Sequence, residues 1–575
     1  MSEPHPSVFR NRGFRVYLVA TTISAVGDFL YTVGLLAVVY DATRSSAWVG
    51  ATVFARVVAW AVGTAAGGVL GDRVDRRRVI VGLNVVAGLV VLALAVSAGL
   101  GAAVVVLVSL ATLLNLVVGL LNPSLAAAVP SIVGEDDVAT ANAAVTTVEQ
   151  VSTVAGPALG ALLVTIASPT VAFALNSASF LVAAWLFTLV PRAGSTAVDA
   201  APGEGSATRL EDGAAEPTVR FRDGIAAVRG SRSAAVLLSI LVAALFGFGF
   251  EVVLFVLVAV RRLGFDSAGA GYLTMATGVG GVVASLFAAR VASQDRPSGF
   301  LVAVVLSGVT PVALSFATSW PLAFSSLIVG GGAYVVVEVF VVTQIQRVVP
   351  DELLARVFGL LMSFGAIATA AGSVLAPLLE HTVGLRWAVA LSGVATVVVT
   401  LVLAPSLPAI TRAATARRLE LAPKVDVLAA LAIFSDLDDL ALERLAAAVT
   451  EETVEPGTVV LREGDPADDL FIVRSGVLDV RSTGGTAAPA RFANAMGPGD
   501  WFGEIGLIER LARTATVTAT TRSTLWRISG DVFLAALEAG PAVPDALRLG
   551  MVTRLARTHP SRRVGASSGG GDAAA

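Results

Sequence analysis

A stretch close to the C-terminal end of the chain, Phe502–Thr516 (FGEIGLIERLARTAT), carries the residue types best suited to bind a small ligand. Gly503 and Glu504 come directly before a short apolar helical turn, and Arg513 follows the glutamate at a spacing of nine residues. Backbone N–H groups at a helix start attract an anion, a guanidinium neutralises it, and a carboxylate accepts hydrogen bonds from sugar hydroxyls. The stretch therefore predicts a site for one phosphate and one sugar, as in a ligand sensor.

The elements that must position this stretch lie between residues 426 and 558. An amphipathic helical region at 427–449 comes first, and residues 530–558 are predicted to be helical again. Between them, apolar and polar residues alternate in short segments that glycines interrupt, which is typical of a small β-barrel or β-roll. The predicted strands fall within residues 457–465, 468–482, 490–507 and 515–530.

The rest of the chain has the composition of a membrane protein. Of its 575 residues, 55% are hydrophobic and 14% are charged, and the mean hydropathy is +0.80, values that an ordinary soluble protein of this size does not tolerate. The net charge of −3 indicates no nucleic-acid partner. Cysteine is absent, which excludes disulfides and thiol chemistry, and the three histidines are isolated in sequence, so we expect no metal site.

Apolar runs of about 20 residues recur along the first 406 residues, each long enough to cross a bilayer core. The first run is too long for a signal peptide and lacks a small-residue cleavage site, so it is predicted to be retained. We expect twelve transmembrane helices, at 14–40, 47–70, 79–98, 102–122, 140–167, 170–190, 233–260, 268–289, 299–318, 321–345, 355–379 and 385–406.

The longest segment between two spans divides the predicted helices into two sets of six. Two pairs of prolines recur at the same spacing in the two sets, which indicates a duplicated six-helix unit of the kind that forms many secondary transporters. The expected organisation is a cytoplasmic N-terminus (1–13), a first half (14–190), a flexible cytoplasmic linker (191–232), a second half (233–406), a charged connector (407–425), the soluble domain (426–558) and a disordered tail (559–575).

Arginines are concentrated in the loops on the side of the N-terminus. The loops on the other side hold Arg44, Arg261, Arg262 and Arg386. Because positively charged loops stay in the cytoplasm, this distribution predicts a multi-pass protein of the cytoplasmic membrane with both termini in the cytoplasm. Two adjacent arginines, Arg261 and Arg262, fit this topology least well, because they lie on the side that should carry few positive charges.

The loop between the second and third predicted spans, residues 68–78 (GVLGDRVDRRR), resembles the G-x-x-x-D-R-x-G-R-R signature of the major facilitator superfamily, with Asp75 in place of the second glycine. A second motif in span five resembles the glycine-proline motif of the proton-linked exporters in that superfamily. Together with Asp28 in span one, these motifs point to the branch that contains siderophore and macrolide exporters. The span-five motif consists of Gly156, Pro157 and Gly160.

The resemblance implies a gating role for the loop between spans two and three. Asp72 is expected to stabilise the N-terminus of a neighbouring helix, which family resemblance identifies as span eleven, starting near Asp351. The arginines have two interpretations, since anchors at the lipid headgroups and parts of a gate look identical in sequence. The predicted gating residues are Gly68, Asp72, Arg73, Arg76 and Arg77.

Five ionisable residues fall inside the predicted spans, where a charge costs several kcal/mol unless it is paired or faces water. Counting along the helices puts Asp28 and Arg56 at similar depth, so they can form either a structural ion pair or a proton site. Glu149 and Glu338 are predicted to face a cavity. The candidate proton or substrate residues are Asp28, Arg56, Glu149, Glu251 and Glu338. Glycines near 278–281 and 330–332 are interpreted as helix packing contacts.

Residues 426–558 resemble the cyclic nucleotide-binding domain, and Phe502–Thr516 aligns with its phosphate-binding cassette, with Ala512 where the family usually has proline. The resemblance implies that Glu504 holds the ribose 2′-hydroxyl, that Gly503 lets the backbone approach, and that Arg513 pairs with the cyclic phosphate. The predicted binding residues are Gly503, Glu504, Ile505, Arg513, Thr514 and Ala515. Cyclic AMP or cyclic GMP is the expected ligand. A β-roll that binds nothing is the alternative.

The expected fold is thus an all-α polytopic membrane domain followed by a soluble β-roll with flanking helices. The predicted function is proton-coupled export of a small amphiphilic compound, regulated by a cyclic nucleotide and requiring no cofactor. The predicted partners are the lipid bilayer, a small-molecule substrate and a cyclic nucleotide, and the oligomeric state stays open. The alternative is a cyclic-nucleotide sensor or scaffold on a transporter fold that no longer transports. We expect no enzyme, because no nucleophile and base occur together in the sequence.

Overall fold

The computed structural model describes residues 8–73, 75–133, 138–190, 228, 231–293, 298–349, 351–434, 437, 439–482, 491–509 and 511–539. These residues form two compact units. The first contains the apolar helices and runs to Thr415, and the second consists chiefly of the chain from Ala416 onward.

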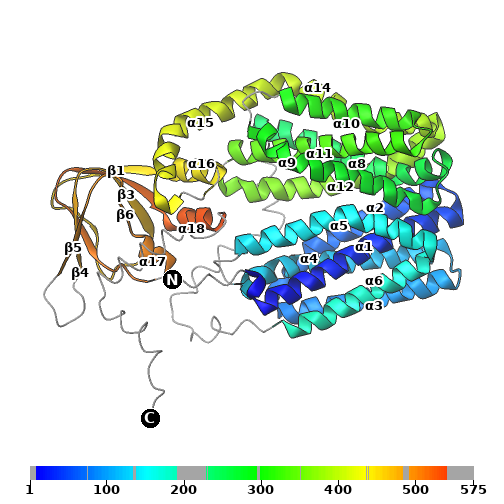
Figure 1. Cartoon of the computed structure of the whole chain (residues 1–575), viewed down its shortest axis with the longest axis horizontal. Helices are drawn as coiled ribbons and strands as arrows, with labels where there is room; N and C mark the ends of the chain where they lie inside the picture. The colour runs from blue at the N-terminus through cyan, green and yellow to red at the C-terminus, as the bar shows by residue number, and fades with distance from the viewer. Residues whose placement is uncertain are drawn as a thin grey trace, which may run out of the picture. The chain divides into compact units, whose positions relative to one another are not determined.

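Six long helices make up the first half of the helical unit (Figure 1). Their starts follow side-chain caps: Asn11, Asp75 and Ser168 each accept a hydrogen bond from a backbone N–H in the first turn of the helix that follows. A short 3₁₀ helix, Val8–Arg10, precedes them. The helices are α1 (Arg12–Thr43), α2 (Ser46–Arg73), α3 (Arg76–Gly99), α4 (Val104–Val133), α5 (Val138–Ile166) and α6 (Pro169–Leu189).

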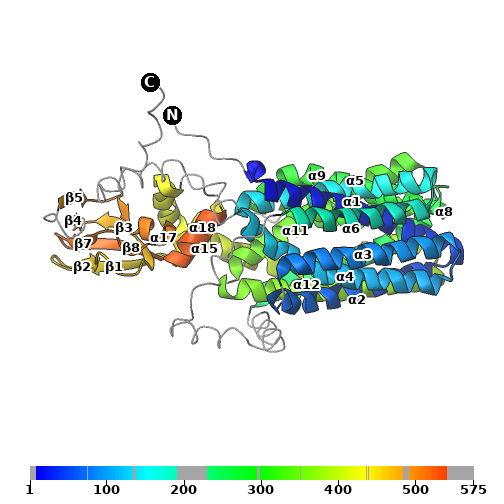
Figure 2. The same cartoon turned by 90° about the horizontal axis from the view of Figure 1, so that it is seen from below.

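The second half begins with α8 and also consists chiefly of long helices (Figures 1 and 2). Its last span is interrupted at Gly393, where a Cβ atom would lie 2.9 Å from Cα of Gly308 in a neighbouring helix. The elements are α8 (Arg232–Arg261), η4 (Ser267–Gly269), α9 (Ala270–Ser293), α10 (Ser298–Phe316), α11 (Trp320–Val348), α12 (Asp351–Val383), α13 (Leu385–Ser392), α14 (Val394–Leu403) and η5 (Ala404–Ser406).

Within the described residues, 12 helices are long and apolar enough to cross a membrane, which confirms the predicted polytopic fold. The predicted connector, 407–425, belongs to a helix, α15 (Leu407–Ala429), that directly follows the last span. Alanine, leucine and arginine, which are strong helix formers, make up most of this segment and explain why it does not form a loop.

Glycines allow the membrane helices to approach each other closely. A Cβ atom on Gly280 of α9 would lie 1.8 Å from the carbonyl oxygen of Ile328 in α11, and one on Gly331 of α11 would lie 2.0 Å from the carbonyl oxygen of Thr277. Any larger side chain would push these two helices apart. The prediction that these glycines serve helix packing is therefore confirmed.

The two ends of the helical bundle differ in how they connect the halves. We call the end that holds Arg12 and Arg73 the arginine-rich end, and the other the opposite end. At the opposite end, Ser267 of η4 donates a hydrogen bond to Asp41 of α1 at 2.6 Å. Thr165 of α5 similarly donates to Asp266, which precedes η4, at 2.7 Å. Polar contacts therefore join the first and second halves at this end.

The second unit contains two four-stranded antiparallel sheets, with strand orders β1-β8-β3-β6 and β2-β7-β4-β5, so the predicted β-roll is confirmed (Figure 2). The strands are β1 (Thr450–Val454), β2 (Val459–Leu461), β3 (Asp469–Ser475), β4 (Leu478–Ser482), β5 (Arg491–Met496), β6 (Trp501–Phe502), β7 (Thr516–Ala519) and β8 (Ser523–Ser529).

Helices flank these sheets, as the sequence predicts. Besides α15 they are η6 (Ala432–Phe434), α16 (Asp439–Ala448), α17 (Glu504–Ile508) and α18 (Gly530–Ala539). Phe434 and Phe533 pack edge to face, with ring centroids 6.1 Å apart, and join the helices in one core. Apolar side chains of the two sheets, among them Val473 and Leu525, form a second core.

Strand β1 is absent from the predictions, because its sequence, TEETV, is polar at four of its five positions and has no apolar alternation. It forms by antiparallel pairing with β8 along its whole length. Several predicted segments lie outside the described residues: most of the linker 191–232, the helical continuation 540–558 and the tail 559–575.

Candidate functional site

The phosphate-and-sugar stretch begins where β6 ends and α17 starts. Gly503, the residue between them, has φ of 98°, a left-handed conformation that favours glycine. A Cβ atom at this position would lie 2.8 Å both from Nη1 of Arg513 and from the carbonyl oxygen of Asp469. Conformation and space therefore both require glycine here.

Arg513 is buried next to this glycine, with 5% of its surface exposed. Its guanidinium donates to the carbonyl oxygens of Gly503 at 3.1 Å and Asp469 at 2.9 Å. Burial lowers the pKa of Arg513 from its ordinary value, and the carboxylates around it, Asp469 first, act in the opposite direction. The structure thus holds a charged group rigidly at the position where the sequence predicts phosphate binding.

The remaining predicted binding residues lie along the same turn. Glu504 is 2% exposed and begins α17, and Ile505 is buried in the core shared with the flanking helices. Thr514 and Ala515 are half-buried beside Arg513. All six residues belong to the short segment from residue 503 to residue 515, and the buried ones anchor it to the domain. Their individual roles in binding stay predictions.

Asp469, the first residue of β3, is a part of this site that the sequence analysis missed. Its side chain lies 2.6 Å from Nη2 of Arg527 on β8, while its backbone oxygen accepts from Arg513. The hydrogen bond to Asp469 raises the pKa of Arg527. An acidic residue at a strand start is common, so only the pairing of β3 with β8 reveals that Asp469 links the two arginines.

The predicted gating loop joins helices of the first half. Asp75, the departure from the superfamily signature, caps α3 by accepting from the N–H of Arg78 at 2.9 Å. Arg76 donates to the carbonyl oxygen of Ala127 in α4 at 3.2 Å, and Arg77 donates at 3.2 Å to that of Phe187 in the last turn of α6. These two arginines therefore satisfy backbone carbonyls near helix ends.

Of the other members of the predicted gating loop, the structure describes only the surroundings of Gly68. Gly68 lies on α2, and a Cβ atom there would meet nothing within 4 Å. Asp72 and Arg73 belong to the last turn of α2, but their side chains, like that of Asp351, lie outside the described part of the structure. The expected contact of Asp72 with span eleven thus stays a prediction.

The glycine-proline motif lies where α5 packs against α1. A Cβ atom on Gly156 would lie 2.5 Å from Cβ of Phe29, and one on Gly160 would lie 3.2 Å from Cα of Leu30. The carbonyl oxygen of Pro157 approaches Gly271 of α9 equally closely. The motif therefore allows α5 to contact both the first and the second half.

Asp28 and Arg56 lie near each other but bind different partners. Asn176 of α6 donates to Asp28 at 3.4 Å, and Arg56 donates to Thr32 Oγ1 at 2.9 Å, with its guanidinium 5.0 Å from the Tyr31 ring centroid. Of the two interpretations left open by the sequence, a direct ion pair is not formed, since Asp28 and Arg56 interact only electrostatically through space, and a proton site stays a prediction. The sequence analysis compared only the depths of the two residues in the membrane. It did not consider the hydroxyl, amide and aromatic side chains of α1 and α6 that compete for the carboxylate of Asp28 and the guanidinium of Arg56.

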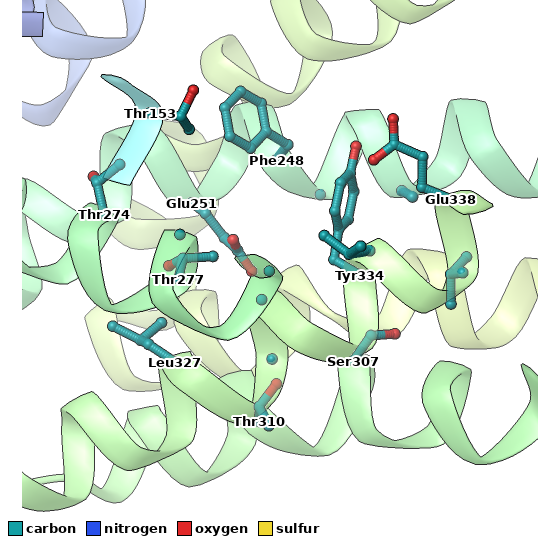
Figure 3. Close-up of a pocket in the computed structure, with 18 of the residues that line it drawn as sticks. Thr153, Phe248, Glu251, Thr274, Thr277, Ser307, Thr310, Leu327, Tyr334 and Glu338 are labelled. Carbon is teal, nitrogen blue, oxygen red and sulfur yellow. The ribbon is translucent and has the colours of Figure 1, made fainter. Parts of the chain in front are cut away.

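A cavity of about 890 Å³ lies mostly in the second half and is lined by residues of α5, α8, α9, α10, α11 and α13. Glu251 of α8 and Glu338 of α11 both line it, so the prediction that Glu338 faces a cavity is confirmed. Figure 3 shows Tyr334 between the two carboxylates, and this tyrosine interacts electrostatically with both. Threonines and serines add hydroxyl groups to the lining.

Glu149 does not line this cavity, although its sequence neighbours Gln150 and Thr153 do. Its side chain is exposed, and it interacts electrostatically with Tyr17 of α1. Of the two glutamates that the sequence predicts to face a cavity, Glu338 lines this one and Glu149 does not. The helical rotation of α5, which the count of depth along the span ignores, turns position 149 away and positions 146, 147, 150 and 153 inward.

Comparison with known protein families agrees with this two-part structure. The family model described as transmembrane secretion effector matches residues 5–430. The cyclic nucleotide-binding domain model matches residues 451–539. Together these matches confirm the predicted fusion of a major facilitator-type membrane domain to a cyclic nucleotide-binding domain.

Individual relatives match shorter parts of the chain. An uncharacterized NTE family protein of Mycobacterium tuberculosis is 35% identical over 149 residues, which are 25% of this chain and 25% of the relative. A cAMP-dependent protein kinase regulatory subunit of Yarrowia lipolytica is 39% identical over 101 residues, or 18% of this chain and 26% of that protein. The chain thus spans about a quarter of the length of these curated relatives.

Among solved structures, the regulatory domain of Toxoplasma gondii PKA, crystallised with cAMP, is 32% identical, with a TM-score of 0.20 and coverage of 23% of this chain and 47% of that one. The match over residues 5–430 extends across both helical halves. The chain therefore belongs to the transmembrane secretion effector family of membrane transporters and carries a cyclic nucleotide-binding domain after its last membrane helix.

Proposed function

We propose that this protein is a proton-coupled exporter of a small amphiphilic compound, and that cyclic AMP or cyclic GMP bound at Gly503–Ala515 controls its transport rate. The protein would lie in the cytoplasmic membrane with its arginine-rich end and both termini in the cytoplasm. Its substrate would enter from the cytoplasmic side and leave after the two halves rock against each other.

One structural observation carries the transport part of this proposal. The described polar contacts between the halves lie at the opposite end of the bundle, as with Ser267 and Asp41. The cavity extends along the membrane helices, from Val258 in the last turn of α8 near the opposite end to Thr343 in the last turns of α11 toward the arginine-rich end. A bundle whose halves are joined by polar contacts at one end and that encloses a cavity at membrane depth fits transport by alternating access.

Carboxylates in the spans support proton coupling. Asp28, Glu251 and Glu338 lie on membrane helices, where an ionised carboxylate is costly unless it is paired or hydrated. Such a group can take up a proton on one side of the membrane and release it on the other as the halves move. Exchange of protons against substrate would then follow from alternating access.

The nucleotide-binding part rests on Glu504 and Arg513. Both are buried, Glu504 directly after the left-handed Gly503 and Arg513 in contact with it, and the family resemblance assigns them to the ribose and the phosphate. Regulation additionally requires that the nucleotide bind one conformation of the transporter more tightly than the other. The helix α15, which continues from the last span into the second unit, offers a covalent route for this coupling.

Transport can be tested with the purified full chain in proteoliposomes. An imposed proton gradient should drive uptake of fluorescent amphiphiles, and collapse of the gradient should stop it. The variants Asp28→Asn, Glu251→Gln and Glu338→Gln should each be compared with the original protein. Unchanged proton-driven flux in all three would remove the coupling proposal.

Nucleotide binding can be tested by calorimetry on the same preparation. We expect cyclic AMP or cyclic GMP to bind with a Kd of tens of micromolar or tighter, roughly −6 kcal/mol or more favourable. Arg513→Ala should abolish binding and remove any effect of nucleotide on flux. Nucleotide binding without flux of any compound would favour a sensor that no longer transports.

A further inference from the structure

The cavity in the second half carries negative charge that the residues lining it do not balance. Glu251 and Glu338 line it, and no arginine, lysine or histidine occurs among the described residues of its wall. Neither glutamate forms an ion pair within the part of the chain that the structure describes. Since an unpaired carboxylate at membrane depth is costly, it favours either uptake of a proton or binding of a positively charged ligand.

The first half handles its buried charge differently. There Asp28 has a cation nearby, because the guanidinium of Arg56 acts on it electrostatically. Asn176 additionally donates a hydrogen bond to Asp28 at 3.4 Å. Asp28 thus has an amide and a cationic side chain of the protein nearby, whereas the described lining of the second-half cavity supplies two carboxyl groups and no cationic side chain.

The rest of the cavity wall fits the body of an organic molecule better than a hydrated metal ion. Phe248, Phe255 and Tyr334 contribute aromatic surface, and valines and leucines add aliphatic surface beside threonines, serines and glycines. A metal ion would require several oxygen ligands gathered around one point. Here Tyr334 lies between the two carboxylates, where its ring face can also contact an ammonium or phosphonium group (Figure 3).

We infer that this cavity binds organic cations with a bulky apolar body, with the positive charge held between Glu251 and Tyr334 and the apolar part against Phe248 and Phe255. This inference rests on the proposed transport function and names its substrate class. Glu251 is the main specificity-determining residue, because its side chain is half-buried whereas that of Glu338 is exposed. The less a charge is hydrated, the more strongly it attracts a ligand charge.

A pair of probes of the same shape and opposite charge tests this inference directly. Tetraphenylphosphonium and tetraphenylborate would be titrated into the full chain in lipid nanodiscs, with empty nanodiscs to subtract partitioning into lipid. We expect saturable binding of tetraphenylphosphonium that is at least about tenfold tighter than that of tetraphenylborate. Equal or tighter saturable binding of the anion would overturn the inference, and this comparison needs no variant.

Variants then locate the site. Glu251→Gln keeps the shape of the side chain and should weaken tetraphenylphosphonium binding by about tenfold or more, whereas Glu251→Asp should retain most of it. Glu149→Gln removes the same charge from a glutamate that is outside the cavity, and it should leave binding unchanged. An equal loss in Glu149→Gln and Glu251→Gln would contradict the assigned position.

Binding and transport give separate answers. Charge-selective binding without flux in proteoliposomes would support the cation site and reject the exporter. Proton-driven flux of neutral or anionic amphiphiles, without cation binding at Glu251, would support the exporter and reject the cation site.

Discussion

Arg261 of α8 and Glu380 of α12 form an ion pair at the opposite end of the bundle, with Nη1 and Oε1 2.6 Å apart. The pair extends into the first half, because Ser46 of α2 donates to Oε2 of Glu380 at 2.8 Å, and Nε of Arg261 donates to the hydroxyl of Tyr40 in α1 at 3.3 Å. We call these four residues the Arg261 network. Arg261 lies on the side of the membrane where the positive-inside rule predicts few arginines. Within the Arg261 network it has partners in both halves, which explains its position structurally.

We predict that Glu380→Gln loosens the closure of the opposite end. The substitution removes the ion pair and weakens a link between halves, which should shift the conformational equilibrium by about 1 kcal/mol, or roughly fivefold. Because the chain has no cysteine, spin labels can be attached to new cysteines at the exposed positions Leu100 and Val383, one in each half. Pulsed electron paramagnetic resonance should then show a larger fraction of long distances between the two labels in Glu380→Gln than in the labelled protein without this substitution.

The matched control for this experiment is Glu149→Gln, which neutralises a glutamate outside the Arg261 network. Its distance distribution should equal that of the protein with the two labels alone. If Glu380→Gln gave the same distribution as this control, the Arg261 network would have no role in closure.

Gly503→Ala should abolish nucleotide binding and destabilise the second unit. Alanine at a φ of 98° is strained, and its Cβ atom would collide with Arg513 and with the backbone of Asp469. We expect a loss of about 2 kcal/mol or more of unfolding free energy for that unit. Gly497→Ala is the control, because a Cβ atom there meets nothing within 4 Å. Similar melting curves for the two variants would contradict the prediction.

Arg513→Lys should weaken cyclic nucleotide binding by at least about tenfold although it keeps the positive charge. The guanidinium donates to two carbonyl oxygens at once, those of Gly503 and Asp469, and an ammonium group cannot reproduce this planar fork. Calorimetry on the full chain measures the change. Arg522→Lys, at an exposed arginine paired with Glu455, should bind nucleotide as the original protein does.

Gly280→Ala should disrupt the packing of α9 on α11. The added methyl group would lie 1.8 Å from the carbonyl oxygen of Ile328, so the helices must separate. Overpacking of this kind costs roughly 1–3 kcal/mol. Size-exclusion profiles after graded heating should show earlier loss of the monodisperse peak, while Gly82→Ala, with nothing within 4 Å of its Cβ position, should match the original.

Features that depend on local composition were predictable. The twelve membrane helices follow from runs of apolar residues, because crossing a bilayer requires only length and hydrophobicity. The segment from Gly503 to Arg513, with its glycine before a short helix, was equally predictable, because all its residues are close together in the sequence. Strand β1 was not predictable, because TEETV forms a strand only through its pairing with β8.

The sequence by itself determined which residues lie at membrane depth and which segment could hold a phosphate and a sugar. Tertiary structure alone decided the neighbours of each charge: Asn176 beside Asp28, Thr32 beside Arg56, and Glu251 with Glu338 on one cavity wall. The physical reason is that depth depends on position along one helix. Charge compensation depends instead on the rotation and packing of several helices, which no single span specifies.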